Sequence, residues 1–274
     1  MPELPEVETI KRTLAPHLQG RTIAGVEVHH PGVIAIPDAD SFARILAGKR
    51  ITGLERRGKY LLFNLDDDYG LAAHLRMTGR LVLAASVDPL PPHTHIVWYL
   101  PGDLTLRWVD SRRFGRLYLA RKDEVVFKTG LKELGPEPLD PAFNSATLAA
   151  ICAGRRRPVK QVLLDQRLLA GIGNIYADEI LFVAGLDPRR PAASLNQEEV
   201  ACLRGAIQAV LEQGIANHGT SIRDYVDGSG RQGSNQDHLQ VYSRTGRPCP
   251  RCSQILVRVR LGGRSTHFCP RCQV

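Results

Sequence analysis

Hydrophobic and polar residues follow two different periods along the chain. Val7, Ile10, Leu14 and Leu18 recur at helical spacing and predict an opening helix that ends near Leu18. After it, short alternating or apolar runs broken by Gly, Pro and Asp predict an antiparallel sandwich or barrel, with one short helix at residues 39–46. The predicted strands are Thr22 to Val28, Ile51 to Glu55, Tyr60 to Leu65, Leu71 to Leu75, Leu81 to Ala84, His95 to Leu100, Leu104 to Val109 and Leu117 to Ala120.

The second half of the chain has a helical period. Three prolines within residues 134–141 predict a joint between domains. Beyond it, stretches rich in alanine and leucine predict helices, whereas the polar, glycine-rich stretch at about 219–239 has no period. Such a loop is either a lid or disordered, and we favour a lid. The predicted helices are Ser145 to Gly154, Pro158 to Gln166, Asn174 to Gly185 and Asn196 to His218.

These patterns predict an α+β chain with several domains. We expect a β-sandwich domain with the opening helix over residues 1–135 and a linker at 136–141. A helical domain at 142–240 and a short tail at 241–274 follow.

Charge is the unusual feature of the composition. The chain has 274 residues, of which 43% are hydrophobic and 23% charged, as in ordinary globular proteins, but its net charge is +8. A polyanion is therefore the expected partner. No apolar run approaches the length of a membrane span, and the N-terminus lacks the pattern of a signal peptide. We expect a cytoplasmic, nucleoid-associated protein with no membrane partner.

The tail contains a strong metal-binding signature. Four of the six cysteines form two C-x-x-C pairs separated by sixteen residues, which predicts one structural Zn²⁺ held by four thiolates with no open coordination position. The other two, Cys152 and Cys202, lie among alanines and leucines and are expected to be buried apolar fillers. The zinc ligands are Cys249, Cys252, Cys269 and Cys272.

The same tail is strongly basic. Residues 255–261 alternate, Gly262 and Gly263 make a turn, and Arg264 follows at the tip of the predicted hairpin. Residues 241–274 hold seven arginines and no acidic residue, which is typical of a surface that binds nucleic acid.

The N-terminal residues could supply a nucleophile. Removal of Met1 would leave Pro2 as a secondary amine, which forms an iminium ion directly when it attacks a sugar carbon or aldehyde. Glu3 and Glu6 would lie at the positive end of the opening helix, where one could donate a proton. The alternative is structural, because proline and glutamate are ordinary residues at a helix start.

Three basic segments of the first half also allow two interpretations. Residues 56–59, with Lys59, could contact phosphate or form an ordinary surface turn. Met77 and Phe114 each lie among arginines, so they could be exposed wedges that separate bases, or they could point into the core.

A fourth segment joins two predicted helices in the second half. Asn174 follows a glycine-bearing turn and is expected to cap the next helix, which would leave backbone N–H groups to bind phosphate or simply cap the helix. Lys160 lies near another helix start, where solvated surface is the alternative.

In their order along the chain these motifs resemble the formamidopyrimidine-DNA glycosylases, bacterial enzymes that remove oxidised purines such as 8-oxoguanine. The resemblance covers the whole length. It implies a β-sandwich with the opening helix, a helix-two-turn-helix domain and a β-hairpin zinc finger, with DNA in the cleft between. It also implies a monomer whose partner is double-stranded DNA containing oxidised bases or abasic sites. The motifs are residues 2–6, 57–59, Met77 with 112–114, 171–177 and the zinc hairpin.

The resemblance also implies roles for individual residues. Pro2 would attack C1′ of the damaged nucleotide, Glu3 would donate a proton to the sugar, and Glu6 would organise the site. The same iminium would allow β- and δ-elimination, which nick the strand. Phosphate contacts would be Lys59, Asn174 and Arg264, with His74 and Lys160 nearby. The gap-filling residues would be Met77, Arg112 and Phe114, with Arg113 also binding DNA. The loop over the everted base would include Ser221, Arg223 and Tyr225.

Three other functions compete with this one. An endonuclease VIII-like glycosylase would share Pro2, Glu3 and the zinc finger but prefer oxidised pyrimidines; Leu4 and Met77 argue for the purine enzyme. A non-catalytic zinc-finger DNA-binding protein would explain the charge and the tail, yet would not need the N-terminal residues. A tautomerase that uses an N-terminal proline would need neither a zinc finger nor a basic surface.

Overall fold

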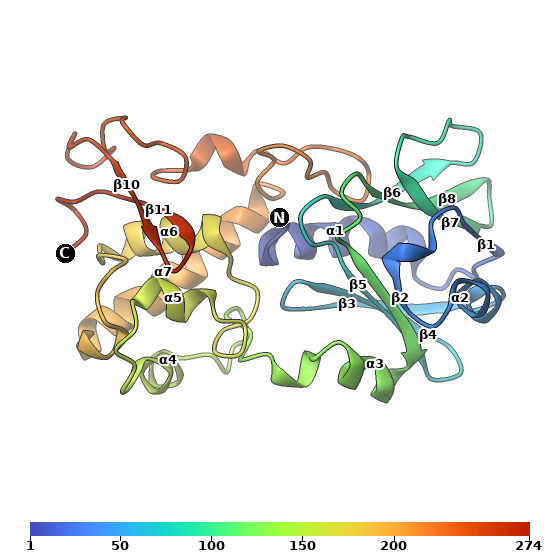
Figure 1. The fold of residues 1–274 in the computed structure, drawn as a ribbon, viewed down its shortest axis with the longest axis horizontal. Helices are drawn as coiled ribbons and strands as arrows, with labels where there is room; N and C mark the ends of the chain where they lie inside the picture. Colours follow the sequence, from blue (N-terminus) through green and yellow to red (C-terminus); the bar gives the residue numbers. More distant parts are fainter. The chain divides into compact units, whose positions relative to one another are not determined.

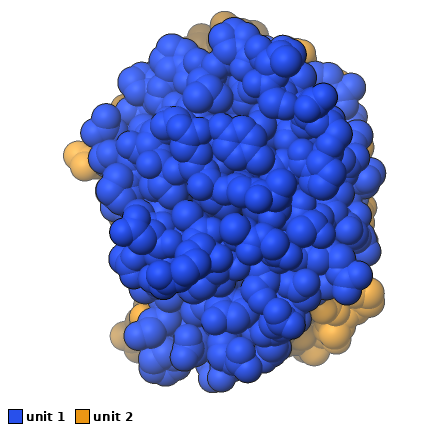
Figure 2. Space-filling model, turned by 90° about the vertical axis from the view of Figure 1, so that its right-hand side faces the viewer, with its two compact units in different colours: residues 1–132, 217–234 blue, residues 133–216, 235–274 orange.

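The computed structural model describes residues 1–274, which form two compact units (Figure 2). The first unit comprises residues 1–132 and 217–234, and the second comprises residues 133–216 and 235–274. The chain therefore leaves the second unit after residue 216 and returns to it after residue 234. None of the helices combines the length and the apolar character that crossing a membrane requires.

The first unit consists of two sheets and the opening helix α1 (Leu4–Leu18), drawn in blue in Figure 1. One sheet has the strand order β1-β7-β8-β6 and the other β2-β9-β5-β4-β3; every pairing is antiparallel except that of β2 with β9. The strands are β1 (Gly25–Val28), β2 (Ile34–Ile36), β3 (Ile51–Arg57), β4 (Tyr60–Leu65), β5 (Tyr69–His74), β6 (Gly79–Ala85), β7 (Thr94–Leu100), β8 (Leu104–Asp110) and β9 (Arg116–Arg121).

The predicted helical stripe packs into the core of this unit. Val7, Ile10, Leu14 and Leu18 of α1 are almost completely buried and join one apolar cluster with residues from both sheets. Burying each such side chain contributes about 1.5–3 kcal/mol. The expected sandwich with its opening helix is confirmed, and α2 (Ala39–Leu46) has the predicted bounds.

Two elements of this unit were not predicted from the hydrophobic pattern. The strand β2 has only three residues and lies between Pro31 and Pro37, so it is too short to show a period. The helix α3 (Lys122–Lys128) buries only Val125 and leaves Phe127 exposed, so it has no apolar stripe.

The second unit is built around α6 (Asn174–Ala184). Residues 175–182 are all buried, because α6 packs against α5, α7 and β11 (Figure 1). The helix ends at Gly185, whose φ of 72° suits a left-handed C-cap. The other elements are α4 (Ser145–Cys152), α5 (Val159–Leu164), α7 (Gln197–Ala216), β10 (Val257–Leu261) and β11 (Arg264–Phe268).

The two cysteines outside the metal signature differ in burial. Cys152 is buried, as expected, but Cys202 is exposed, so its predicted role as a buried filler is wrong. The buried stripe of α7 runs through Leu203, Ala206 and Val210, and Cys202 lies outside it.

Candidate nucleic-acid interface

The first turn of α1 brings the N-terminal candidates together. Pro2 is buried, and Glu3 is the N-cap residue of the helix. The backbone N–H of Glu3 donates to Oε2 of Glu6 at 2.8 Å, as one half of a capping box. Oε1 of Glu6 accepts the backbone N–H of Thr220 at 2.8 Å. One buried carboxylate therefore joins the start of the helix to the glycine-rich loop.

That loop is anchored on both sides of an exposed tip. Tyr225 is buried in the core of the first unit, and its hydroxyl donates to the carbonyl of His218 at 3.1 Å. Burial raises the pKa of the Tyr225 hydroxyl above its ordinary value. Ser221 donates its hydroxyl to the carbonyl of Tyr225 and accepts the N–H of Gly233. Tyr225 is thus an anchor of the loop, and the exposed side chains are those of the tip at 222–224.

Lys59 and His74 lie near each other at strand ends of the first unit. Lys59 follows Gly58, whose φ is 54°, in the tight turn between β3 and β4, and His74 ends β5. Nδ1 of His74 accepts the N–H of Arg76 at 3.1 Å, so the proton of the neutral ring is carried by Nε2. Burial, then the charges of Arg76 and Lys59, lower the pKa of His74 to about 3. His74 can therefore act as a neutral N–H donor at physiological pH.

This lowered pKa predicts a specific acid sensitivity. Above pH 6.5 the ring is neutral in both states, but below it the unfolded chain binds a proton that the folded protein does not accept until about pH 3. Stability is therefore lost as the pH falls through this window. Between pH 7 and 4.5 we expect the wild type to lose about 2–3 kcal/mol more unfolding free energy than His74→Gln, measured by urea denaturation. Equal losses in the two proteins would show that His74 takes up a proton in the folded state.

Met77, Arg112 and Phe114 form one exposed cluster. Met77 and Phe114 are 46% and 45% exposed, which excludes the interpretation that they point into the core. Nη1 of Arg112 lies 3.5 Å from the sulfur of Met77, and its guanidinium lies 4.5 Å from the ring centroid of Phe114. The neighbouring Arg113 is exposed, with a φ of 58°. Two turns far apart in the sequence thus present exposed apolar side chains among cations, which leaves the exposed one of the two interpretations of these segments.

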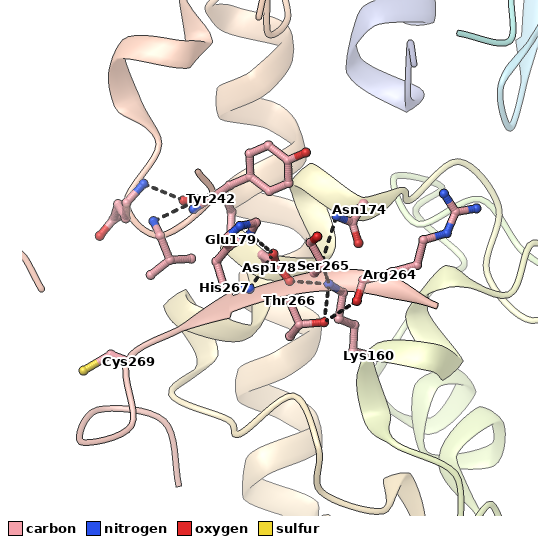
Figure 3. A network of polar contacts seen from close by, with 12 residues as sticks. Lys160, Asn174, Asp178, Glu179, Tyr242, Arg264, Ser265, Thr266, His267 and Cys269 are labelled. Carbon is pink, nitrogen blue, oxygen red and sulfur yellow. Dashed lines mark hydrogen bonds and ion pairs between the residues drawn. The ribbon is translucent and has the colours of Figure 1, made fainter. Parts of the chain in front are cut away.

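In the second unit, Asn174 contacts the zinc hairpin (Figure 3). Its predicted role as a helix cap is wrong, because Gly173 is the N-cap of α6 and Asn174 is the first helical residue. Nδ2 of Asn174 donates to the carbonyl of Ser265 at 3.0 Å, while its buried Oδ1 has no partner within the protein. Arg264 is exposed beside Ser265, and its side chain points away from the polar network in Figure 3.

The hairpin tip has the predicted turn chemistry. Gly262 and Gly263 have φ values of 53° and 77°, as a two-residue hairpin turn between Leu261 and Arg264 requires. A Cβ atom at Gly262 would lie 2.5 Å from the side-chain nitrogen of Gln161 on α5, so the tip packs closely on that helix.

Lys160 is buried beneath this hairpin (Figure 3). Its ammonium group donates to the carbonyl of Ser265 at 2.8 Å and to the hydroxyl of Thr266 at 2.9 Å, and it pairs with Asp178 at 2.6 Å. The other oxygen of Asp178 accepts both the backbone N–H and the ring nitrogen of His267. The side chain expected to contact phosphate instead supports the strand that follows Arg264.

Removing the Lys160 charge should weaken the second unit. Lys160→Met would leave the carboxylate of Asp178 buried without its cation, at a cost of about 3–5 kcal/mol. We expect a loss of that size in unfolding free energy by urea denaturation. Lys132→Met, the same replacement at an exposed position, should change it by less than about 0.5 kcal/mol. Equal stability of the two variants would contradict a structural role for the buried pair.

Two acidic residues on α6 were not among the predicted site residues. Asp178 is one, and Glu179 accepts the backbone N–H groups of Gln240, Val241 and Tyr242, which lead into the zinc tail. Burial raises the pKa of Glu179, and the three N–H groups oppose this. Two carboxylates within an otherwise apolar helix were the available signal, since a buried charge requires partners.

The four predicted metal ligands converge. Sγ of Cys249 lies 3.9 Å from Sγ of Cys272, and Sγ of Cys252 lies 3.5 Å from Sγ of Cys269. All four sulfur atoms lie within 4.8 Å of one another. Tetrahedral zinc with Zn–S bonds of about 2.3 Å would separate its ligands by about 3.8 Å. The cluster therefore fits one structural Zn²⁺, as predicted.

Three family models match successive parts of the chain. Residues 1–117 match the formamidopyrimidine-DNA glycosylase N-terminal domain, and residues 134–226 match the H2TH domain of the same proteins. Residues 246–274 match a zinc finger found in FPG and IleRS.

Individual relatives extend over nearly the whole chain. A formamidopyrimidine-DNA glycosylase of Moorella thermoacetica is 75% identical over 95% of each chain. A Lactococcus lactis Fpg, solved with DNA containing an abasic site, is 37% identical with a TM-score of 0.92 and 99% of each chain covered. Its complexes with DNA containing Fapy-dG or an oxidised pyrimidine are 36% identical to this chain, with TM-scores of 0.91 and the same coverage.

Proposed function

Since the chain belongs to the formamidopyrimidine-DNA glycosylase family, we propose that it excises oxidised purines from duplex DNA with Pro2 as its nucleophile. DNA glycosylase and AP lyase activities are those of this family. The observation that carries the assignment of Pro2 is its burial immediately before Glu3, the N-cap of α1, whose backbone N–H binds the carboxylate of Glu6.

In the proposed reaction the Pro2 nitrogen attacks C1′, the bond from C1′ to the base breaks with its electron pair leaving on the base, and the N–H proton of Pro2 passes to the departing base. Glu3 donates a proton to the ring oxygen of the sugar, which opens the ring and leaves an iminium ion. Loss of a C2′ proton then expels the 3′ phosphate, and a second elimination expels the 5′ phosphate. Glu6 holds the first turn of α1 and the loop at Thr220 in position through its two carboxylate oxygens.

Binding is assigned to cations and to the exposed wedge. Lys59 and the neutral donor His74 in the first unit, with Asn174 and Arg264 in the second, are the proposed phosphate contacts. Met77, Arg112 and Phe114 would fill the space left when a nucleotide leaves the stack, a step that any enzyme acting on a base within a duplex requires. The net charge of +8 supports attraction to the DNA backbone. We infer that the protein works as a monomer in the cytoplasm, on chromosomal DNA.

The base-covering role belongs to the tip of the glycine-rich loop. Ser221 and Tyr225 hold this loop, and Arg223 lies in its exposed tip. We therefore assign contact with the everted base to the tip and the adjacent backbone.

Borohydride trapping tests the proposal. A duplex with one 8-oxoguanine opposite cytosine should give a covalent adduct whose protein part is the N-terminal peptide by mass spectrometry, while an undamaged duplex should give none. An adduct on an internal lysine would overturn the assignment of Pro2. Absence of any adduct, with Met1 shown to be removed, would overturn the covalent mechanism.

One observation favours a broader lesion range. The Lactococcus lactis relative has been solved with DNA containing an oxidised pyrimidine as well as with Fapy-dG. Single-turnover excision measured on matched duplexes with either lesion should be faster for the oxidised purine; the reverse order would favour the endonuclease VIII-like alternative.

A further inference from the structure

The side chains of the wedge cluster are only partly buried. Met77 and Phe114 are nearly half exposed, and they lie in separate turns, between β5 and β6 and between β8 and β9. Arg76 and Arg113, beside them, have positive φ values of 54° and 58°, which disfavour both turns on their own. Something beneath the surface must therefore hold the two turns in this conformation.

Asp110 lies directly beneath both turns. It ends β8, is completely buried, and pairs with Gly79 at the start of β6. Its Oδ1 accepts the hydroxyl of Thr78 at 2.5 Å and the N–H of Arg112 at 3.2 Å, and its Oδ2 accepts the N–H of Gly115 at 2.8 Å. One carboxylate thus binds the residue after Met77 and residues on both sides of Phe114.

The surroundings leave this carboxylate little freedom. The carbonyl of Asp110 lies 2.7 Å from Nε2 of His95, and its N–H donates to the carbonyl of His93. A Cβ atom at Gly115 would lie 2.4 Å from the Trp108 ring and 3.1 Å from Oδ2 of Asp110. The turn after β8 therefore packs against the Trp108 ring as closely as only glycine allows, with the carboxylate close beside it.

We propose that Asp110 is a positioning residue that locks Met77, Arg112 and Phe114 into one preorganised wedge. The Thr78 hydroxyl connects the two turns, because it donates to Asp110 and accepts the N–H of Arg112 at 3.3 Å, whereas the bonds from Asp110 to Arg112 and Gly115 lie within one turn. The proposal rests on the proposed function, since the wedge acts only when a nucleotide leaves a base stack. A fixed wedge enters the gap without first losing the conformational freedom of two separate turns.

Thr78→Val tests this connection with little risk to the fold, because it removes one hydroxyl and keeps the side-chain shape. We expect kcat/KM for 8-oxoguanine excision from duplex DNA to fall at least tenfold. We also expect a smaller fluorescence change of 2-aminopurine placed opposite an abasic-site analogue, which reports insertion of the wedge. Thr78→Ser, which keeps the hydroxyl, should restore both. Asp110→Asn should have an effect at least as large as Thr78→Val.

Cleavage of a single-stranded abasic oligonucleotide provides the control, because it has no base stack for a wedge to enter. Thr78→Val should cleave it within twofold of the wild-type rate. Normal duplex excision and fluorescence in Thr78→Val would overturn the proposal, as would an equal loss on single-stranded DNA. If the wild type itself cleaves neither substrate, the proposed function fails, and the role of Asp110 in a DNA wedge fails with it.

Discussion

Insertion of one alanine between Met1 and Pro2 is expected to abolish excision while leaving DNA binding intact. The Pro2 nitrogen would then be a tertiary amide, which has no lone pair available for attack on C1′. Loss of a covalent nucleophile lowers kcat by on the order of 10³-fold or more. Single-turnover excision of 8-oxoguanine and borohydride trapping measure this loss, and a mobility shift on a duplex with an abasic-site analogue measures binding.

Measuring excision and DNA binding on the same extended variant distinguishes a covalent enzyme from a protein that only binds DNA. Burial of Pro2 and the hydrogen bond from Glu3 to Glu6 would be disturbed by the inserted residue, so unfolding by urea must be compared with the wild type. Glu3→Gln provides the matched variant, because it keeps the N-terminal amine but removes the proton donor. It should lose excision of an intact damaged base. It should retain more activity on a ready-made abasic site, where the ring opens without expelling a base. Unchanged excision by the extended chain would exclude Pro2 as the nucleophile.

The structure could be predicted from the sequence wherever a local pattern is compatible with only one conformation. The stripe of α1, the glycine turn before Arg264 and the two cysteine pairs each specify their own geometry, so their arrangement could be predicted. Exposure of Met77 could not be derived from its own segment. The turn that carries Met77 is bound through Thr78 to Asp110, thirty-two residues further along the chain, so no local pattern could indicate its conformation.

Residues were misplaced where tertiary contacts decide their environment. Lys160 follows three arginines in a stretch typical of a basic surface, yet it is buried because Asp178 on another helix provides its counter-charge. Asparagine is a favoured N-cap residue, but the N-cap position of α6 is occupied by Gly173. The side-chain amide of Asn174 instead donates to the carbonyl of Ser265. Neither partner is near in sequence, so no local pattern could indicate the pairing.

The zinc hairpin has little apolar core of its own and therefore depends on its metal. The apolar cluster behind the four sulfurs includes only Phe182, Val241 and Leu256 besides the cysteines themselves. Such a small core cannot order β10 and β11 alone, whereas structural zinc supplies about 10–16 kcal/mol in zinc-finger peptides. Cys269→Ser, which removes one ligand, should therefore release zinc and disorder the strand that carries Arg264.

This loss should appear first in DNA binding. If Arg264 contacts phosphate through charged hydrogen bonds of about 1.5–3 kcal/mol, zinc-free protein should bind an abasic-site duplex at least about tenfold more weakly. Arg264→Ala with zinc retained gives the contribution of that side chain alone, and Cys152→Ser controls for loss of a thiol elsewhere. Cys269→His, which can still ligate zinc, should recover much of the affinity. Atomic absorption shows whether the protein is free of zinc. If the zinc-free protein binds DNA as tightly as the wild type, the hairpin does not hold the DNA. If it loses more affinity than Arg264→Ala does, zinc positions more of the tail than this one arginine.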